Sequence, residues 1–276
     1  MSASPIKPLR SALFVPASRP ERIPRALESG ADQVIVDLED AVSLEDKDTA
    51  RAALASFLEA HPQAGVAVRV NACDTPWFHD DIALCHRYSG VSILVLPKTE
   101  SAAQINDARG RSTLPVWPLI ETAAGLLALG EIANTEGVER LSYGGLDLGV
   151  DLGLAPGTEG AARIMDTVRY QLLVHARAAR LPAPLETVST EFNDADTLRS
   201  TARLARDMGF AGMLCIHPRQ IAPAHEGFGY DPADVAWARR VLALAETHKG
   251  AAFQLEGRMV DAPVIHRARQ IMANQA

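Results

Sequence analysis

The chain is poor in cysteine, in aromatic residues and in long apolar runs. Of its 276 residues, 3 are cysteines and 5% are aromatic. Cys73, Cys85 and Cys215 are odd in number and far apart, which argues against a disulfide framework or a zinc site and suits a reducing compartment. No segment has the length of a membrane-spanning helix, and the N-terminus has no signal-like apolar stretch. We therefore expect a cytoplasmic protein with no membrane partner.

Basic charge is also scarce. Lysine and arginine number 27 against 34 acidic residues, for a formal net charge of −7. Without a basic stripe to displace counterions, nucleic acid is not an expected partner. No Gly-x-Gly-x-x-Gly motif follows the first apolar run, so a nucleotide-binding open sheet has little support. The hydrophobic content of 47% is ample for a sizeable core.

What the chain does have is a series of short apolar runs, most followed by a longer stretch with helical periodicity. The runs are continuous rather than alternating, as in strands buried on both faces of a parallel sheet. About eight such units in roughly 220 residues predict a (β/α)8 TIM-type barrel. The predicted strands are Ala12–Pro16, Gln33–Leu38, Val66–Asn71, Ser92–Pro97, Val116–Ile120, Arg140–Tyr143, Glu186–Thr190 and Gly212–Ile216. The predicted helices include Pro20–Glu28, Asp46–Ala60, Ala102–Arg109, Ala123–Ala133, Gly160–Arg180 and Asp194–Met208.

Two further helical stretches, Pro232–Thr247 and Ala262–Ala273, come after the last strand–helix unit. No Pro/Ser-rich linker separates them from the preceding residues. We expect residues 1–225 to form the barrel with the active site. Residues 226–276 are expected to form a C-terminal helical extension, or lid, that contacts a neighbouring subunit.

Two carboxylates, Glu121 and Asp147, follow neighbouring predicted strands. The active site of such a barrel lies at the C-terminal ends of its strands. Two carboxylates there can bind one hard divalent cation, with water and substrate oxygens as the remaining ligands. We predict that Glu121 and Asp147 bind Mg²⁺ and, through it, the substrate. The alternative for either residue alone is an N-cap of the following helix.

Arg69 emerges from an apolar strand, and its guanidinium suits bidentate recognition of a substrate carboxylate. The alternative is a buried ion pair with Asp37 or Glu39, and both can hold at once. Asp37 and Glu39 share one strand face by the two-residue period. We consider them catalytic candidates that would orient Arg69 or a metal-bound water.

Three other polar residues have plainer interpretations. Lys98 at the end of a strand is equally a solvated charge. His217 is at least as consistent with a structural histidine as with a base. Asp151 is expected to structure its loop.

Several motifs, in order along nearly the whole chain, resemble the HpcH/HpaI aldolase and citrate lyase beta-subunit family. Each is weak alone, but the ordered set is specific. The resemblance implies a Mg²⁺-dependent carbon–carbon lyase, similar to malyl-CoA and citramalyl-CoA lyases, that assembles as a homotrimer or hexamer. Its substrates would be thioesters such as citramalyl-, malyl- or citryl-CoA, cleaved to an acyl thioester and a 2-oxo acid. The motifs are Arg10-Ser-Ala-Leu-Phe-Val-Pro16, Val36-Asp-Leu-Glu-Asp-Ala-Val42, Arg69-Val-Asn71, Ile120-Glu-Thr-Ala123, Gly144-Gly-Leu-Asp-Leu-Gly-Val-Asp-Leu-Gly153, Cys215-Ile-His-Pro218 and Gly257-Arg-Met-Val-Asp-Ala-Pro263.

Asp261 lies in the last of these motifs. By resemblance it reaches a neighbouring subunit's site and acts as the general acid/base. The residues alone are also consistent with an N-cap of the final helix, with Pro263 at an early helical position. CoA, or an acyl-carrier phosphopantetheine, is expected across the barrel mouth near the segment 19–25, whose three arginines could meet phosphates.

The chain departs from the family pattern at Ala17, at Leu185-Glu186 and at Met213. These departures leave the thioester and its carrier open. The alternative functions are a CoA-independent pyruvate-type aldolase, a thioesterase on malyl-CoA-like substrates, and a thioester-carrier subunit of a citrate-lyase-like complex.

Overall fold

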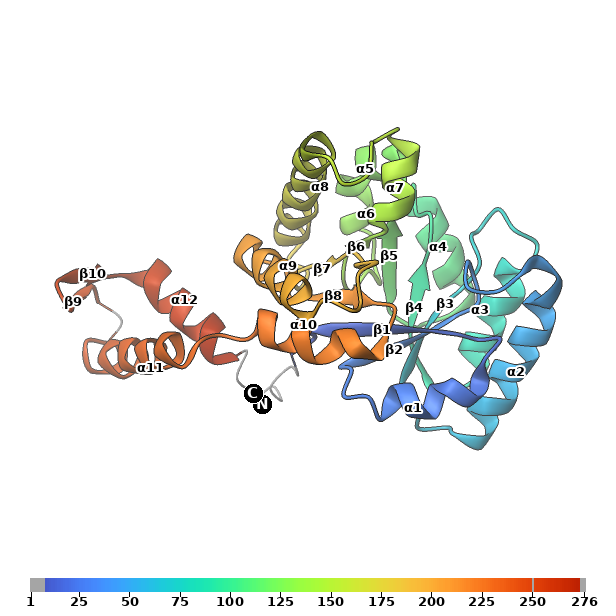
Figure 1. Cartoon of the computed structure of the whole chain (residues 1–276), viewed down its shortest axis with the longest axis horizontal. Coiled ribbons are helices and arrows are strands. Elements are labelled where there is room, and N and C mark those ends of the chain that lie inside the picture. Colours follow the sequence, from blue (N-terminus) through green and yellow to red (C-terminus); the bar gives the residue numbers. More distant parts are fainter. Residues whose placement is uncertain (1–7, 250, 274–276) are drawn as a thin grey trace.

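Eight parallel strands close into a barrel in the order in which they occur in the chain (Figure 1). The computed structural model describes residues 8–249 and 251–273. Each strand pairs with its sequence neighbours, and β1 pairs with β8 to complete the ring. The predicted (β/α)8 fold is therefore confirmed. The strands are β1 (Ser11–Pro16), β2 (Gln33–Asp37), β3 (Val66–Arg69), β4 (Val91–Leu96), β5 (Val116–Ile120), β6 (Ser142–Tyr143), β7 (Leu185–Glu186) and β8 (Gly212–Cys215).

Helices alternate with the strands and cover the outside of the barrel (Figure 1). The predicted helix Ala123–Ala133 is two short helices, because Ala128 between them has ψ near 1°. The helices Phe78–Arg87, Gly145–Asp151 and Ile221–Phe228 were not among those named from the sequence. The helices around the barrel are α1 (Ile23–Leu27), α2 (Lys47–Ala60), α3 (Phe78–Arg87), α4 (Ala102–Arg111), α5 (Ala123–Leu127), α6 (Leu129–Ala133), α7 (Gly145–Asp151), α8 (Glu159–Ala178), α9 (Ala195–Met208) and α10 (Ile221–Phe228). None of the helices in the described ranges is long and apolar enough to cross a bilayer.

Strand β7 differs from its prediction and is only Leu185–Glu186, where Glu186–Thr190 was expected. Pro184 precedes it and has no N–H to donate to a neighbouring strand. After the strand, the hydroxyl of Thr187 accepts the backbone N–H of Gly145 at 2.8 Å, which ties this loop to α7 instead of extending the sheet.

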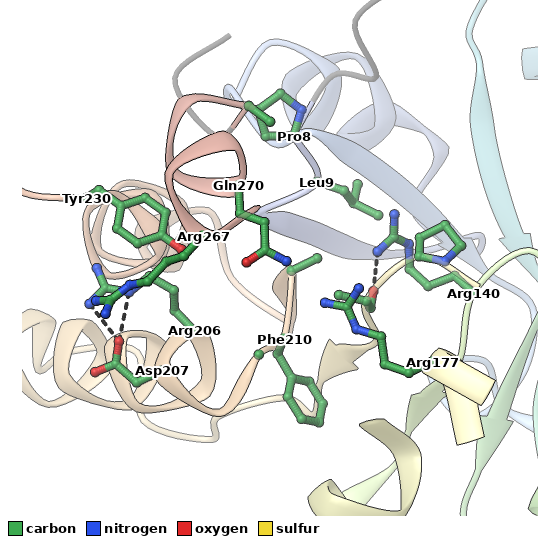
Figure 2. Close-up of a pocket in the computed structure, with 15 residues that line it drawn as sticks. Pro8, Leu9, Arg140, Arg177, Arg206, Asp207, Phe210, Tyr230, Arg267 and Gln270 are labelled. Carbon is green, nitrogen blue, oxygen red and sulfur yellow. Dashed lines mark hydrogen bonds and ion pairs between the residues drawn. The ribbon is translucent and has the colours of Figure 1, made fainter. Parts of the chain in front are cut away.

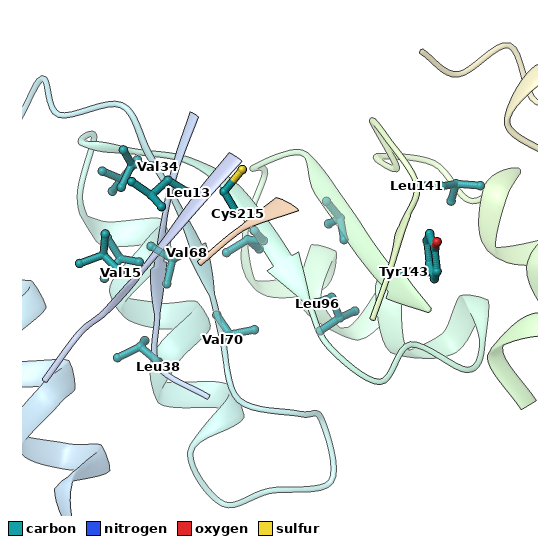
Figure 3. Packing of buried hydrophobic residues seen from close by; sticks show 14 of the residues in the cluster. Leu13, Val15, Val34, Leu38, Val68, Val70, Leu96, Leu141, Tyr143 and Cys215 are labelled. Atoms are coloured by element: carbon teal, nitrogen blue, oxygen red, sulfur yellow. The ribbon is translucent and has the colours of Figure 1, made fainter. Parts of the chain in front are cut away.

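The barrel has an inner and an outer apolar layer. Side chains alternate across a strand, so every second residue faces the barrel axis. The inner layer contains Ala12, Ile35, Ala67, Trp117 and Leu214. The outer layer packs the strands against the helices. Figure 3 shows part of it, including Leu13, Val15, Val34, Val68 and Tyr143.

The C-terminal residues form an extension that projects from the barrel (Figure 1). It consists of α11 (Pro232–Thr247), a hairpin of β9 (Phe253–Leu255) and β10 (Arg258–Val260), and α12 (Ala262–Ala273). Its buried apolar residues form a separate cluster. The expected division between residues 225 and 226 falls inside α10, which packs against α9 and β1. We propose that the division lies instead at Gly229, the C-cap of α10.

Candidate active site

A cavity of about 390 Å³ opens where the C-terminal ends of the strands meet. Four of the predicted site residues line it: Asp37, Arg69, Glu121 and Asp147. Its remaining walls are mainly apolar and come from β1, β5 and β8 and the loop after β7: Phe14, Pro16, Leu119, Val188, Leu214 and Ile216. The barrel thus brings together residues that are more than 100 positions apart in the chain.

The strand phase explains why these polar side chains point inward. Asp37 follows Ile35 of the inner layer by two residues, and Arg69 follows Ala67 in the same way. The register pairs Asp37 directly with Arg69 across β2 and β3. Glu121 keeps the phase of Trp117 and Leu119 at the end of β5. The inner face of the barrel therefore turns from apolar to polar at its C-terminal edge.

Glu121 is a buried carboxylate with little compensation. Its exposed fraction is 2%, and its Oε2 accepts the backbone N–H of Lys98 at 3.0 Å. Burial raises the pKa of Glu121 to about 8, and the nearby carboxylates of Glu39 and Asp147 add to the rise against the opposing effects of Lys98 N–H and Arg69. The N-cap alternative does not apply, because Thr122 caps α5 by accepting the N–H of Gly125.

Asp147 lies in the first turn of α7 and is exposed to the cavity. Its side chain does not cap the helix, because Gly144 occupies the N-cap position. Gly144 has a second role. A Cβ built there would lie 2.4 Å from Oε1 of Glu121, so only a glycine lets the Glu121 carboxylate lie against this turn.

Arg69 is held in a fork by Asp37. Its Nε donates to Asp37 Oδ1 at 2.8 Å and its Nη2 donates to Oδ2 at 2.6 Å. Asp37 also accepts the backbone N–H groups of Glu39 and Ala41, which fixes the carboxylate. Burial opposes the charge of Arg69, but the carboxylates of Asp37 and Glu39 outweigh it and raise its pKa above the ordinary value. The predicted ion pair is therefore present, and the guanidinium remains charged.

Glu39 connects Arg69 to Lys98. Its Oε1 accepts Lys98 Nζ at 2.7 Å, and its Oε2 lies 3.0 Å from Arg69 Nη1. Within the described part of the chain, Oε2 receives no well-aligned hydrogen bond although it is buried. Burial raises the pKa of Glu39 despite the two cations. Glu39 does not line the cavity, so it contributes to the site through its contacts with Arg69 and Lys98.

Two features of the site are not evident in the sequence. Lys98 has φ +48°, a left-handed conformation that costs a non-glycine residue about 1–3 kcal/mol. This conformation turns its N–H toward Glu121 while its Nζ reaches Glu39. Phe14 lies beneath Arg69, with 4.9 Å between the guanidinium carbon and the ring centroid. The Pro97-Lys98 sequence after a strand and the Gly144-Gly145 pair are the signals that could have indicated a tight approach here.

Other candidates lie outside the cavity. Asp151 accepts the N–H of Ala123 at 2.7 Å and so structures its loop, as expected. His217 caps the turn after β8 and stacks on Phe192, which is a structural role. Asp261 lies in the extension, after β10, where its Oδ1 is 3.4 Å from the N–H of Val264. A single chain therefore does not bring Asp261 to the barrel mouth.

A second cavity of about 600 Å³ adjoins the first and shares Phe14, Pro16 and Ile216 with it. Arg22 and Arg25 line this second cavity. These are two of the three arginines that were expected near a thioester carrier, and both are exposed.

The residues at the mouth fit a hard divalent cation. Glu121 is a buried carboxylate that makes no ion pair within the described residues, Gly144 leaves room beside it, and Asp147 faces the same space. Among residues 8–249 and 251–273, no group of three or more His, Cys, Asp or Glu side chains is arranged to hold a metal. Two carboxylates completed by water and substrate oxygens are the arrangement that Mg²⁺ uses in such sites.

Comparison with known sequences identifies the family. The profile of the HpcH/HpaI aldolase/citrate lyase family matches residues 10–218. The chain belongs to the HpcH/HpaI aldolase/citrate lyase family. The resemblance predicted from the sequence is thus confirmed, and the match ends just after β8.

Related proteins align with this chain over nearly its full length. A citrate lyase subunit beta-like protein of Deinococcus radiodurans is 38% identical and covers 97% of this chain and 98% of its own. A (3S)-malyl-CoA thioesterase of Cereibacter sphaeroides is 34% identical, with 96% and 94% covered. Among solved structures, CitE of Mycobacterium tuberculosis in complex with magnesium, acetoacetate and coenzyme A aligns with a TM-score of 0.82, 34% identity and 97% of each chain covered.

Proposed function

We propose that this protein is a Mg²⁺-dependent lyase that cleaves, or forms, a carbon–carbon bond in a 3-hydroxyacyl-CoA thioester such as citramalyl-, malyl- or citryl-CoA. The products of cleavage are an acyl thioester and a 2-oxo acid. The observation that carries the proposal is the meeting of Glu121, Asp147 and Arg69 in one cavity at the C-terminal edge of the barrel. The mycobacterial relative bound to magnesium, acetoacetate and coenzyme A supports it.

Glu121 and Asp147 would hold the magnesium ion. When bound, the ion supplies a Lewis acid for the hydroxyl and carboxylate oxygens of the substrate. Glu39 would act as a positioning residue, because its two oxygens contact Arg69 and Lys98. Lys98 positions both carboxylates, Glu121 through its N–H and Glu39 through its Nζ.

Arg69 would bind the oxo-acid end of the substrate. Asp37 occupies its Nε and Nη2, which leaves Nη1, 3.0 Å from Glu39 Oε2 and 3.7 Å from Asp40 Oδ2, as the group that would donate to the substrate. Asp37 is then a positioning residue, because it fixes the plane of the guanidinium without reaching the substrate. The positive charge of Arg69 stabilises negative charge that develops on the carbonyl oxygen during bond cleavage.

The thioester portion would extend into the adjoining cavity. The two cavities share an apolar wall, which suits a pantetheine arm, and the exposed Arg22 and Arg25 suit its phosphates. An acyl-carrier phosphopantetheine would fit the same path. Aromatic and aliphatic side chains around the oxo acid would keep bulk water from the reacting carbon.

Asp261 would complete the site from a neighbouring subunit as the general acid/base of the acyl enolate. Its place in a projecting extension, with a weak capping contact of 3.4 Å, leaves the carboxylate available. A mixing experiment tests this role. Asp261→Ala and Glu121→Ala are each expected to be inactive, whereas refolded mixtures should regain part of the activity in hybrid sites. A mixture as inactive as both parents would exclude action across subunits.

The decisive test is a panel of citramalyl-, malyl- and citryl-CoA with Mg²⁺, following both the 2-oxo acid and the free thiol. Release of oxo acid without free thiol supports the lyase. Thiol release without oxo acid would point to a thioesterase, the activity named for the Cereibacter relative. Turnover of a free hydroxy-oxo acid alone would point to a pyruvate-type aldolase. No turnover, together with a tightly co-purifying partner, would point to a carrier subunit.

The metal assignment is tested separately by calorimetry. Glu121→Gln and Asp147→Asn should each abolish Mg²⁺ binding, because each removes one of the two protein ligands. Asp151→Asn is the matched control and should bind Mg²⁺ like the parent chain. Asp151 lies on the same helix as Asp147, but its carboxylate accepts the N–H of Ala123. Unchanged Mg²⁺ affinity in the first two variants would refute the site.

A further inference from the structure

A third cavity, of about 900 Å³, lies at the opposite end of the barrel (Figure 2). Residues at the starts of β1, β6, β7 and β8 line one side, including Leu9, Arg140 and Ala211. The C-terminal ends of α8 and α9 and residues of α12 line the rest. The cavity therefore lies between the barrel and the C-terminal extension, on the face away from the candidate active site. Its volume is in the range of small-molecule binding sites.

The lining is strongly basic, in contrast to the acidic chain as a whole. Among the residues that the structure describes, Arg140, Arg177, Arg206 and Arg267 line the cavity with a single acid, Asp207. Four positive side chains and one negative leave a charge of +3. Figure 2 shows Arg140 and Arg177 on one side, and Arg206 and Arg267 with Tyr230 on the other.

Arg140 carries an unfilled donor inside this cavity. The residue is 7% exposed, and one of its Nη groups donates to the backbone oxygen of Ala183. Its Nε is buried and, among the residues that the structure describes, has no hydrogen-bond partner. Within the same ranges no carboxylate is in ion-pair contact with Arg140 or the exposed Arg177, and the neighbouring Glu139 acts on Arg140 only from a distance, too weakly to offset burial. A buried guanidinium without a direct counterion is costly, and an anion in the cavity would offset that cost.

The other two arginines are partly engaged but still present positive charge. Arg206 pairs with Asp207 at 2.8 Å and lies 4.9 Å from the ring of Tyr230. Arg267 is exposed and lies 5.8 Å from the ring of Trp237. Neither ring contact neutralises a guanidinium.

An alternative role for these basic residues is only to offset the partial negative charge at the C-termini of the helices that end at this cavity. Helices α8 and α9 end at this cavity, and each contributes roughly −0.5 charge. Together they amount to roughly −1, about a third of the +3 from side chains. The helix dipoles therefore leave a net positive field in the cavity.

We propose that this cavity binds a small polyphosphate, either free or as part of a nucleotide, which bridges Arg140 and Arg177 of the barrel to Arg267 of the extension. Guanidinium groups on opposite sides suit a chain of phosphoryl groups, because each planar fork can bind one group through two hydrogen bonds. Because its ligands come from both parts of the chain, a bound polyphosphate would fix the extension relative to the barrel.

Calorimetry and thermal unfolding of the full chain with tripolyphosphate, at low ionic strength, test the proposal. We expect saturable one-to-one binding and a rise in melting temperature. Arg177→Gln and Arg267→Gln should each weaken binding by about tenfold, since each loses a charge-assisted pair. Arg163→Gln is the matched control, because Arg163 lies on the same helix as Arg177 but pairs with Glu159 at the surface. It should bind tripolyphosphate like the parent chain.

Parallel titrations with ATP and CoA distinguish a free polyphosphate from a nucleotide as the ligand of this cavity. Tighter binding of ATP that falls with Arg177→Gln identifies a nucleotide, and equal binding identifies the phosphate chain alone. CoA affinity should be unaffected by Arg177→Gln. The proposal is overturned if sodium sulfate at matched ionic strength stabilises the protein equally, if Arg177→Gln and Arg267→Gln bind like the control, or if Arg177→Gln weakens CoA as much as tripolyphosphate. Because the readout is binding, the outcome does not depend on the lyase activity.

Discussion

Replacing Asp37 by asparagine removes the anchor of Arg69 with almost no change in shape. Asp37 receives two hydrogen bonds from the guanidinium, at 2.8 and 2.6 Å, and two from backbone N–H groups. An asparagine amide nitrogen cannot accept any of them, so at least one buried donor faces another donor. Neutralising one partner of a buried pair costs about 3–5 kcal/mol. Because Glu39 stays 3.0 Å from Arg69, we expect the lower end, about 3 kcal/mol.

The assay is the free energy of unfolding from denaturant titration, with a double-mutant cycle. The double variant Asp37→Asn/Arg69→Met lacks both charges. Its free energy of unfolding should be about 2 kcal/mol higher than the value predicted by adding the losses of the two single variants. The control is Asp196→Asn, which breaks a surface pair with Arg199 and should not shift the midpoint measurably. Additive losses in the cycle, or a loss in Asp37→Asn no larger than in the control, would refute the buried fork.

The same variant separates positioning from metal binding. If Asp37 acts only through Arg69, Asp37→Asn should lower turnover by about 10–100-fold. Its Mg²⁺ affinity should stay within about twofold, because neither Glu121 nor Asp147 contacts Asp37 in the described hydrogen-bond network. Parallel loss of metal affinity and turnover would show that Asp37 belongs to the metal site itself.

Two further predictions concern single contacts. Gly144→Ala places a Cβ 2.4 Å from Glu121 Oε1 and should weaken Mg²⁺ binding by about tenfold in calorimetry, because the carboxylate must move. Gly149→Ala on the same helix meets only ordinary contacts and should keep the affinity; equal losses would mean that α7 as a whole is disturbed. At the other end of the barrel, burial opposes the charge of Asp32, but hydrogen bonds from His225 and a backbone N–H outweigh burial and lower its pKa below 3.8. The charged carboxylate therefore stabilises the fold above its ordinary pKa, and that stability is lost as the pH falls through the lowered value. Asp32→Asn should lower the free energy of unfolding, measured by denaturant titration, by about 1–2 kcal/mol at pH 7. This difference between the variant and the parent chain should become smaller in acid. A difference that stays constant down to pH 2, well below the ordinary pKa of an aspartate, would contradict this assignment.

The barrel was predictable because its strands are buried on both faces. Runs such as Val34-Ile-Val36 and Ile93-Leu-Val-Leu96 have no polar face, and their spacing leaves room for a helix between each pair. The prediction was less accurate where tertiary contacts decide. β7 ends after two residues because Thr187 binds Gly145, a contact between loops 42 positions apart that no local pattern indicates.

The candidate site was predictable to the extent that it follows strand phase. Asp37, Arg69 and Glu121 each continue the inward-facing residues of a strand, so the period of two places them at one rim. Lys98 was not assignable, because its role depends on a left-handed backbone that turns one N–H to Glu121 and one ammonium to Glu39. Such strain is stable only when surrounding contacts fix it, and those contacts come from two other strands.

The polar rim also supports our proposal that a divalent cation occupies the site. Glu39 and Glu121 are both buried, and the pKa of each is raised by burial even though Arg69 and Lys98 lie beside them. Asp37 already uses two of the Arg69 donors, and the buried Lys47 acts on Asp37 and Glu39, whereas Glu121 makes no ion pair within the described part of the chain. A barrel built only for stability would place apolar side chains here, since isosteric apolar replacement of buried ions is often stabilising. We therefore propose that a divalent cation held between Glu121 and Asp147 offsets the cost of burying the Glu121 carboxylate.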